Sequence, residues 1–330
     1  MTALLAALFF GFVPCFFFAY ILYWLDRYEK EPKILLGAVF LWGAVVAAGG
    51  SYIINSLFGI TIFAVTGSEE LASVTGATLS APLVEETLKG LAVLVVFLIF
   101  RHEFDSILDG IVYAGIAALG FAATENSIYI WRGYASDGWG GLALLVFIRV
   151  ILVGWQHPFY TAFIGIGLAA ARTNRNIFVK LIAPLAGWGM AMFTHSLHNF
   201  LASVPLLGDL TCLLGSFLDW TGVLFMFLFI IWATWLEQKN IILHMREEVQ
   251  SGIISPAQYR TACSAWAQSF AWISSIFSGK FMATSRFYQV VGELAHKKEQ
   301  LRKHGDESGN STLIQKYRKE LSALSPHAHY

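Results

Sequence analysis

Residues 81–100 read APLVEETLKGLAVLVVFLIF, a mostly apolar stretch interrupted by two adjacent glutamates and one lysine. About 20 consecutive, predominantly apolar residues are what an α-helix needs to cross the hydrocarbon core of a bilayer. A charged side chain in the middle of that core costs about 2.5–3.5 kcal/mol even on the most lenient scale. Glu85, Glu86 and Lys89 therefore predict a membrane-spanning helix that carries functional side chains.

Apolar runs of similar length occur along most of the chain. Of its 330 residues, 56% are hydrophobic and only 13% are charged, about half the charged share of an average soluble domain. We predict an all-α fold, a polytopic membrane helical bundle of about seven transmembrane helices, followed by a cytoplasmic helical tail. The predicted spans are residues 3–24, 34–55, 81–100, 107–131, 150–171, 177–202 and 216–236, with a short interfacial stretch at 140–149.

Lysine and arginine are distributed unevenly between the predicted loops. The loops on one side of the membrane carry Arg27, Lys30, Lys33, Arg101, Arg172 and Arg175. The opposite side carries Arg132 alone, and its long segment 56–80 has no lysine or arginine. Because cytoplasmic loops are enriched in positive charge, we predict a multi-pass protein of the cell membrane with an external N-terminus and a cytoplasmic C-terminus. Residues 3–24 follow no positively charged segment, which favours a retained first span over a cleaved signal peptide.

The composition changes near residue 237. We predict a transmembrane core at 1–236, with its motifs between residues 80 and 200, and a mostly helical tail at 237–330. Within the tail, an apolar stripe is formed by Trp266, Phe270, Trp272, Ile273, Ile276 and Phe277. The stripe is compatible with a helix on the inner leaflet, with a small helical hairpin, or with a solvated appendage. A segment rich in Gly, Ser and Asp at 305–311 predicts a flexible link.

Composition and motifs argue against several other classes of function. The formal net charge is zero, so nothing indicates binding to nucleic acid. Cys15, Cys212 and Cys263 are widely separated and form no CxxC pair, which argues against a disulfide framework and a cysteine metal site. The sequence contains neither a GxSxG nucleophile motif nor an HExxH zinc motif, which disfavours serine hydrolases and ordinary zinc proteases.

Ionisable residues in four predicted spans lie at a common depth. Counted from the predicted inner end of each helix at about 1.5 Å per residue, Glu85, Glu125, His157 and His195 all lie about 22–27 Å up. They would form one layer in the outer third of the bilayer. A single buried Glu–Lys pair or a single histidine is often only structural, but a layer contributed by four helices is much harder to explain in that way.

Four further polar residues support this layer, namely Lys89, Asn126, His198 and Asn199. Residues three or four positions apart share a helix face, so Lys89 can neutralise one carboxylate of the Glu85–Glu86 pair while the other acts as a general base. Glycines in the fourth span let helices approach closely, which would bring the layer together. By contrast, we interpret Asp109 at an inner helix end as structural and Arg149 as an interfacial anchor.

The layer contains side chains suited to peptide hydrolysis, which requires an activated water, a group that transfers protons and donors for the developing oxyanion. A carboxylate beside a second carboxylate or a histidine can activate water directly. Alternatively, Glu125, His157 and His195 can hold a zinc ion whose bound water has a pKa near 7. The spacing of the two histidines in the sixth span, and Asn199 as an oxyanion donor, slightly favour the route without a metal.

Four segments together resemble the motifs of the PrsW family of intramembrane proteases, which belongs with the CAAX prenyl proteases. Residues 85–90, EETLKG, resemble the EExxK motif of that family, and residues 121–126, FAATEN, are similar to its FxxxEN motif. His157-Pro158 and the segment HSLHN at 195–199 resemble its two histidine motifs. The segments occur in the family's order, each on its own predicted span, and cover roughly residues 80 to 200.

This resemblance implies an intramembrane peptidase in which Glu85 and Glu86 are catalytic and Glu125 replaces a water-holding histidine of the prenyl proteases. It also implies oxyanion donors at His195 and Asn199, and either zinc or no cofactor. The implied substrate is a single-span membrane protein cut near the outer face, such as an anti-sigma factor. The implied partners are therefore membrane lipid and that substrate, and no oligomeric state is implied.

Two other functions are compatible with the same residues. The layer can be a structural network in a non-catalytic membrane scaffold that binds partner helices. Chains of glutamate and histidine also form proton relays in proton-coupled transporters, although such transporters typically carry inverted repeats and none is evident in this sequence. An enzyme differs from a scaffold in one structural respect, because its glutamate and histidine side chains must converge beside a cavity.

Overall fold

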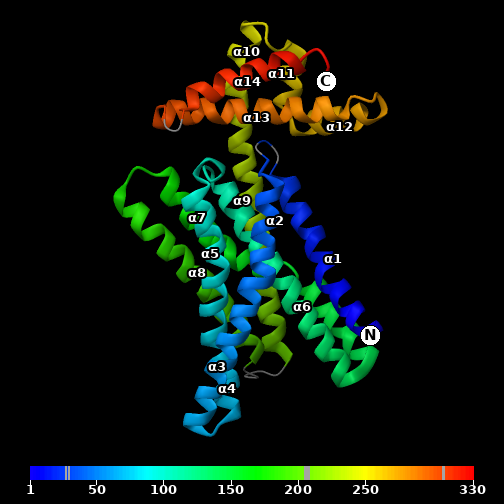
Figure 1. Cartoon of the computed structure of the whole chain (residues 1–330), viewed down its shortest axis with the longest axis vertical. Coiled ribbons are helices and arrows are strands. Elements are labelled where there is room, and N and C mark those ends of the chain that lie inside the picture. Colours follow the sequence, from blue (N-terminus) through cyan, green and yellow to red (C-terminus); the bar gives the residue numbers. More distant parts are fainter. Residues whose placement is uncertain (27, 29, 204–208, 307–308) are drawn as a thin grey trace. The chain divides into compact units, whose positions relative to one another are not determined.

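The computed structural model describes residues 1–26, 28, 30–203, 209–306 and 309–330, and every regular element within those ranges is a helix. The chain divides into two compact units (Figure 1). The first unit comprises Met1–Trp24 and Glu31–Phe229, and the second comprises Leu25–Lys30 and Ile230–Tyr330. Arg27, one of the basic residues used to predict sidedness, lies outside the described residues.

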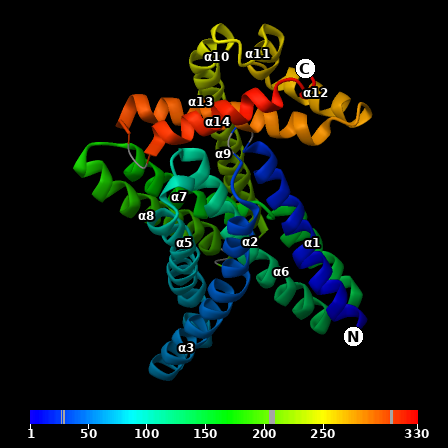
Figure 2. The same ribbon diagram turned by 45° about the horizontal axis from the view of Figure 1, so that its top comes forward.

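The first unit is a bundle of long apolar helices joined by short π-helical and 3₁₀ segments. In chain order its elements are α1 (Thr2–Leu25), α2 (Lys33–Leu41), η1 (Trp42–Ala47), α3 (Ala48–Thr66), α4 (Glu69–Thr75), η2 (Gly76–Ser80), α5 (Ala81–Ile99), η3 (Arg101–Glu103), α6 (Ile107–Val146), η4 (Phe147–Leu152), α7 (Gln156–Thr173), α8 (Ile177–Ser203) and α9 (Asp209–His244), of which α9 continues into the second unit. Figures 1 and 2 both show α5, α7 and α8 side by side, and α1 alongside α6.

The predicted all-α membrane bundle is confirmed, although the count of spanning stretches differs from seven. Five stretches of the described chain are long and apolar enough to cross a bilayer, and they are Thr2–Leu25, Lys33–Thr66, Ile107–Thr173, Ile177–Ser203 and Leu213–Gln250. One of them contains two of the predicted spans, since α6 runs on through η4 into α7. The predicted span at 81–100 forms α5, but its three charged residues set it apart from an ordinary apolar span.

The predicted interfacial stretch at 140–149 is helical, and its position at the membrane interface stays a prediction. It belongs to a second helical arm, residues 139–152, because α6 turns sharply at Asp137 and Gly138. Gly138 has a φ of 62°, a conformation that costs glycine little and other residues considerably more. The chain therefore turns back within α6, and this turn brings residues near 149 alongside residues near 125.

Glycines of α6 let neighbouring helices approach closely, as the sequence predicted. A Cβ atom added to Gly110 would lie 2.3 Å from the backbone oxygen of Gly165 on α7. A Cβ atom on Gly120 would lie 2.0 Å from the backbone oxygen of Phe40 on α2. Because only glycine permits backbones to approach this closely, these positions fix α6 against two neighbours.

The second unit confirms a helical tail, and its side of the membrane stays a prediction. Beyond the end of α9 its helices are α10 (Arg246–Gln250), α11 (Pro256–Ala262), α12 (Ala265–Phe277), α13 (Phe281–His304) and α14 (Asn310–Leu324). Its core contains Phe287, Val291 and Leu294 from α13 and Leu321 from α14. Residues 307 and 308 of the predicted flexible segment lie outside the described residues.

Candidate active site

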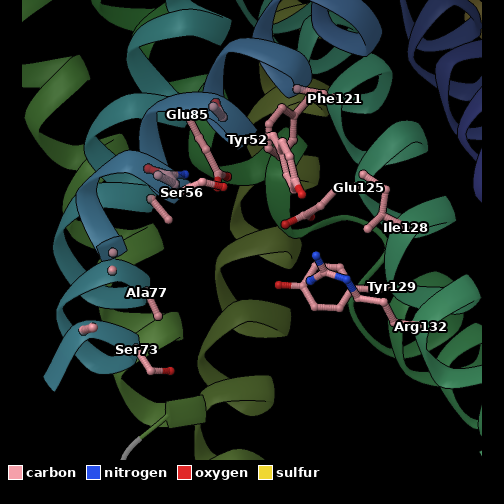
Figure 3. Close-up of a pocket in the computed structure, with 17 residues that line it drawn as sticks. Tyr52, Ser56, Ser73, Ala77, Glu85, Phe121, Glu125, Ile128, Tyr129 and Arg132 are labelled. Carbon is pink, nitrogen blue, oxygen red and sulfur yellow. The ribbon is translucent and has the colours of Figure 1, made fainter. Parts of the chain in front are cut away.

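A cavity of about 360 Å³ lies beside the predicted polar layer. Its walls are formed by α3, α4, η2, α5 and α6. Figure 3 shows Glu85 and Glu125 extending toward this space from different helices, with the Tyr52 side chain between them and Tyr129 and Arg132 further along α6. Carboxylates predicted from separate spans therefore meet at one cavity.

Glu86 is fully buried and has every carboxylate oxygen engaged. Its Oε1 accepts from Lys89 Nζ at 2.5 Å and lies 2.9 Å from Nδ1 of His195. Its Oε2 accepts from the hydroxyl of Thr161 at 2.8 Å. Three helices, α5, α7 and α8, are thus tied together at this carboxylate, and its contacts leave it little freedom to reach a substrate.

Glu125 is held by a histidine and an arginine. Its Oε2 lies 2.9 Å from Nε2 of His157 and accepts from the guanidinium of Arg149. Nε of Arg149 also donates to Oδ1 of Asn126 at 3.0 Å. The interpretation of Arg149 as an interfacial anchor is therefore wrong, because the turn at Gly138 returns this residue to the layer.

Glu85 differs from the other two glutamates in lacking a cationic partner. Its side chain is 8% exposed, and its buried Oε2 has no hydrogen-bond partner. Within the described residues, Lys89 pairs with Glu86 and Arg149 pairs with Glu125, and no lysine or arginine pairs with Glu85. A buried carboxylate in this position must take up a proton or bind a cation.

Two histidines stand next to the unpaired oxygen of Glu85. Nε2 of His195 lies 3.9 Å from this oxygen, while Nδ1 of the same ring faces Glu86 at 2.9 Å. The ring centroids of His157 and His195 are 5.4 Å apart. Since Glu86 can only accept a hydrogen bond when ionised, it holds the hydrogen on Nδ1 and leaves Nε2 free for chemistry.

The chemistry of these donors fits a divalent metal such as zinc. One candidate ligand atom each from Glu85, His157 and His195 lies within 4.8 Å of the others. Two imidazoles and a carboxylate are a known donor set of zinc hydrolases. Each imidazole also contacts a further carboxylate, Glu86 or Glu125, as metal-binding histidines commonly do. Lys89 Nζ lies 3.3 Å from Nδ1 of His157, so a metal would have to share that ring with a cation.

This triad differs from the ligand set predicted from the sequence. Glu125 was expected to join the two histidines, whereas Glu85 occupies that place in the structure. The reason is that Glu125 already binds Arg149, a partner that the sequence did not reveal. The sequence also left open which carboxylate of the Glu85–Glu86 pair Lys89 neutralises. The structure pairs Lys89 with Glu86 at i, i+3.

A second polar cluster, which sequence reasoning missed, lies behind His195. Asp219 on α9 accepts from the hydroxyl of Tyr160 at 2.8 Å, contacts Nδ1 of His198 at 2.6 Å and accepts from Gln156. The ring of Tyr160 stacks on His195 with centroids 5.0 Å apart. An aspartate within the apolar stretch 216–236 was the signal that could have identified this cluster.

Two of the supporting residues have local structural contacts. Nδ2 of Asn199 donates to the backbone oxygen of Ala77 at 2.8 Å, and the neighbouring Ser196 donates to that of Thr78 at 2.7 Å. These bonds attach α8 to η2, directly before α5. Asn199 is therefore engaged by backbone, which weakens the case for it as an oxyanion donor.

The structural interpretation of Asp109 agrees with its contacts. Its carboxylate accepts from the backbone nitrogens of Asp105 and Ser106, and the Ser106 hydroxyl caps the same turn. This reciprocal arrangement is a capping box at the start of α6. Sixteen residues separate Asp109 from Glu125, about 24 Å along a helix.

Comparison with known proteins gives one consistent family. Residues 31–234 match the family model described as "PrsW family intramembrane metalloprotease". A protein named Protease PrsW from Clostridioides difficile is 41% identical over 106 residues, which is 32% of this chain and 42% of that protein. Proteins of the same name from Geobacillus kaustophilus and Oceanobacillus iheyensis are 37% and 29% identical over 106 and 137 residues, or 32% and 41% of this chain and 43% and 54% of their own lengths.

The matched segments thus span about half the length of these curated relatives. No solved structure matches the chain.

Proposed function

The chain belongs to the PrsW family of intramembrane metalloproteases, and from this premise we propose that its polar layer hydrolyses a peptide bond of a membrane-anchored protein. The observation that carries the proposal is the unpaired oxygen of Glu85, buried beside two histidines and lining a cavity. This arrangement supports Glu85 as the group that binds and deprotonates the attacking water. Buried polar atoms of a purely structural network are in most cases hydrogen-bonded.

The neighbours of Glu85 divide the remaining steps. Glu85 takes a proton from water as the oxygen of that water bonds to the carbonyl carbon of the substrate. Glu85 then passes this proton to the departing amine nitrogen as the carbon–nitrogen bond breaks, and Nε2 of His195, whose Nδ1 faces Glu86, would stay available to a metal ion. Lys89 neutralises Glu86, so that this carboxylate orients His195 and does not compete for the water.

Glu85, His157 and His195 would also be the ligands of a zinc ion, with Glu86 and Glu125 orienting the two rings. When bound, such an ion supplies a water whose pKa is lowered to about 7. Two features of the sequence favoured a route without metal, namely Asn199 as an oxyanion donor and the spacing of His195 and His198. In the structure, Asn199 donates to the backbone of Ala77 and His198 contacts Asp219, so both residues are engaged elsewhere. We therefore propose a zinc-dependent enzyme.

The substrate class follows from where the cavity lies. Its walls include α3 and α6, which belong to stretches able to cross a bilayer, so a substrate that reaches Glu85 must itself enter the membrane region. A single-span protein cut near the outer face meets this requirement, and an anti-sigma factor is the first candidate because the family resemblance suggests it. The matched relatives add a protease name without naming a substrate.

The proposal is tested by reconstituting the full chain with a panel of single-span proteins and searching for cleavage products by mass spectrometry. Glu85→Gln keeps the shape of the side chain but removes the base, so cleavage should fall by about 10²–10⁴-fold. Asp109→Asn is the matched control, since the same change there alters a helix cap. Equal rates for Glu85→Gln and the wild type would refute the proposed site.

Zinc dependence has a separate readout. The purified protein should contain one zinc per chain by elemental analysis, and Glu85→Gln and His195→Ala should each lose most of it. A strong chelator should abolish cleavage, and added zinc should restore it. Undiminished cleavage after complete removal of metal would overturn the zinc proposal while leaving hydrolysis by Glu85 in place.

A further inference from the structure

Helix α12 of the second unit exposes most of its large apolar side chains and buries small or polar ones. Three of its large apolar residues point outward, with Trp266 79%, Phe270 67% and Phe277 87% exposed, whereas Trp272 packs against the core of the unit. The residues packed into the domain are Gln268, Ala271 and Ser275, which are all nearly inaccessible. A helix of a soluble domain normally buries the apolar face and exposes the polar one.

The exposed apolar residues form one continuous face. At about 100° per residue, positions 266, 270, 273 and 277 fall within an arc of about 60°, and the three buried positions lie on the opposite side. Phe281 and Met282, at the start of α13, are also exposed. Contiguous apolar surface of this kind marks a site covered by another partner or by a membrane.

The charges around α12 indicate which partner covers it. Helix α12 contains no charged residue, and no Asp or Glu occurs between Glu248 and Glu293. Arg260 and Lys280 lie in that interval and are exposed, whereas Arg286 pairs with Glu293 and Glu320. An apolar face with Trp and Phe, flanked by positive charge and free of negative charge, suits an anionic lipid surface.

The position of α12 in the chain agrees with this partner. The second unit continues directly from α9, and its segment Leu25–Lys30 continues directly from α1, both of which belong to stretches able to cross a bilayer. A domain linked to the bundle at two points cannot leave the membrane surface. We propose that α12 inserts its apolar face into the headgroup region of the leaflet on the side of the tail. This surface is independent of the proposed peptidase.

The test uses full-length protein in vesicles of phosphatidylethanolamine and phosphatidylglycerol. Single cysteines that carry a nitroxide label are placed at Phe270, Ile273 and Phe277, after replacement of the native cysteines. Power saturation then compares collisions with oxygen, which concentrates in lipid, and with a water-soluble nickel complex. Matched controls are Leu224→Cys, on the exposed apolar surface of α9, and Lys316→Cys, on the exposed surface of α14.

Labels on the α12 face should resemble the Leu224 control, with oxygen accessibility several-fold above that to nickel. The Lys316 control should show the reverse. Labels at 270, 273 and 277 that behave like Lys316 would refute the proposal. Labels shielded from both reagents, with spin–spin broadening between chains, would also refute it and would assign the face to a second copy of the protein.

Discussion

At the scale of single residues, three glutamates share one layer and their partners give them different roles. Glu86 is engaged by Lys89 and His195, and Glu125 is engaged by Arg149. Only Glu85 keeps a buried oxygen without a partner among these three. Because an ion-paired carboxylate is a poor base, the choice of partner determines which glutamate can activate water.

The same reasoning makes Asp219 a positioning residue. It binds the hydroxyl of Tyr160, whose ring stacks on His195. Asp219→Asn should lower kcat about tenfold, the effect of losing about 1.4 kcal/mol of alignment, with KM unchanged. Steady-state kinetics on a reconstituted substrate provides the measurement.

Two controls separate positioning from folding. Tyr160→Phe keeps the stacked ring but loses the bond to Asp219, so it should reproduce the kcat loss of Asp219→Asn. Combining both changes should cost little more than either alone, because they remove one interaction. A lower melting temperature with unchanged kcat would show that Asp219 only stabilises the fold.

At the scale of helices, the layer depends on how closely α6 and α7 cross. A Cβ atom on Gly165 would lie 1.9 Å from the backbone oxygen of Gly110, where no side chain can move aside. Gly165→Val should therefore destabilise the bundle by about 1–3 kcal/mol or more and displace His157 from α5. Thermal unfolding in detergent measures the loss.

The matched control is Gly37→Val on α2, because a Cβ atom at Gly37 has nothing within 4 Å. This variant should melt within a few degrees of the wild type, since only helix propensity changes. Equal melting temperatures for the Gly165 and Gly37 variants would contradict the close crossing.

At the scale of the whole molecule, the sidedness of the chain determines which face of the membrane the cavity serves. The positive-inside rule predicts an external N-terminus. Because α3 extends to Thr66, a reporter placed after Gly67 tests the outer side better than one within the helix. Alkaline phosphatase fused there should be active, whereas fusions after Asn174 and after Tyr330 should be inactive. The reversed pattern would move the layer toward the inner face.

The second unit should respond to acid through Glu299. Arg302, His244 and Lys303 contact this carboxylate and hold its pKa well below the usual range. A depressed folded-state pKa contributes stability above the unfolded value of about 4.3, and that contribution is lost as the pH falls. Glu299→Gln should therefore melt below the wild type at pH 7, and the difference should vanish toward pH 2. A difference in melting temperature that does not change with pH would refute this role.

Hydropathy and spacing alone determined the membrane class, the all-helical architecture and the grouping of four ionisable residues in one polar layer. These properties are local, since the apolar length of a run decides whether it spans a bilayer and the helical rise decides the depth of each residue. Glu85, Glu125, His157 and His195 could be grouped by depth for that reason. Most of the tail stripe was visible for the same reason, because helical periodicity places its residues on one face, whereas Trp272 of the predicted stripe packs against the core of the second unit.

Tertiary structure alone decided which of these groups touch. Lys89 pairs with Glu86 and not Glu85 within α5, Arg149 returns to Glu125 across a sharp turn, and Asp219 contacts Tyr160 from a different helix. Each depends on how the helices rotate and cross, which glycine contacts and the turn at Gly138 control. Depth along a helix follows from sequence position, whereas direction around its axis follows from packing. The unpaired oxygen of Glu85 therefore emerges only in the folded bundle.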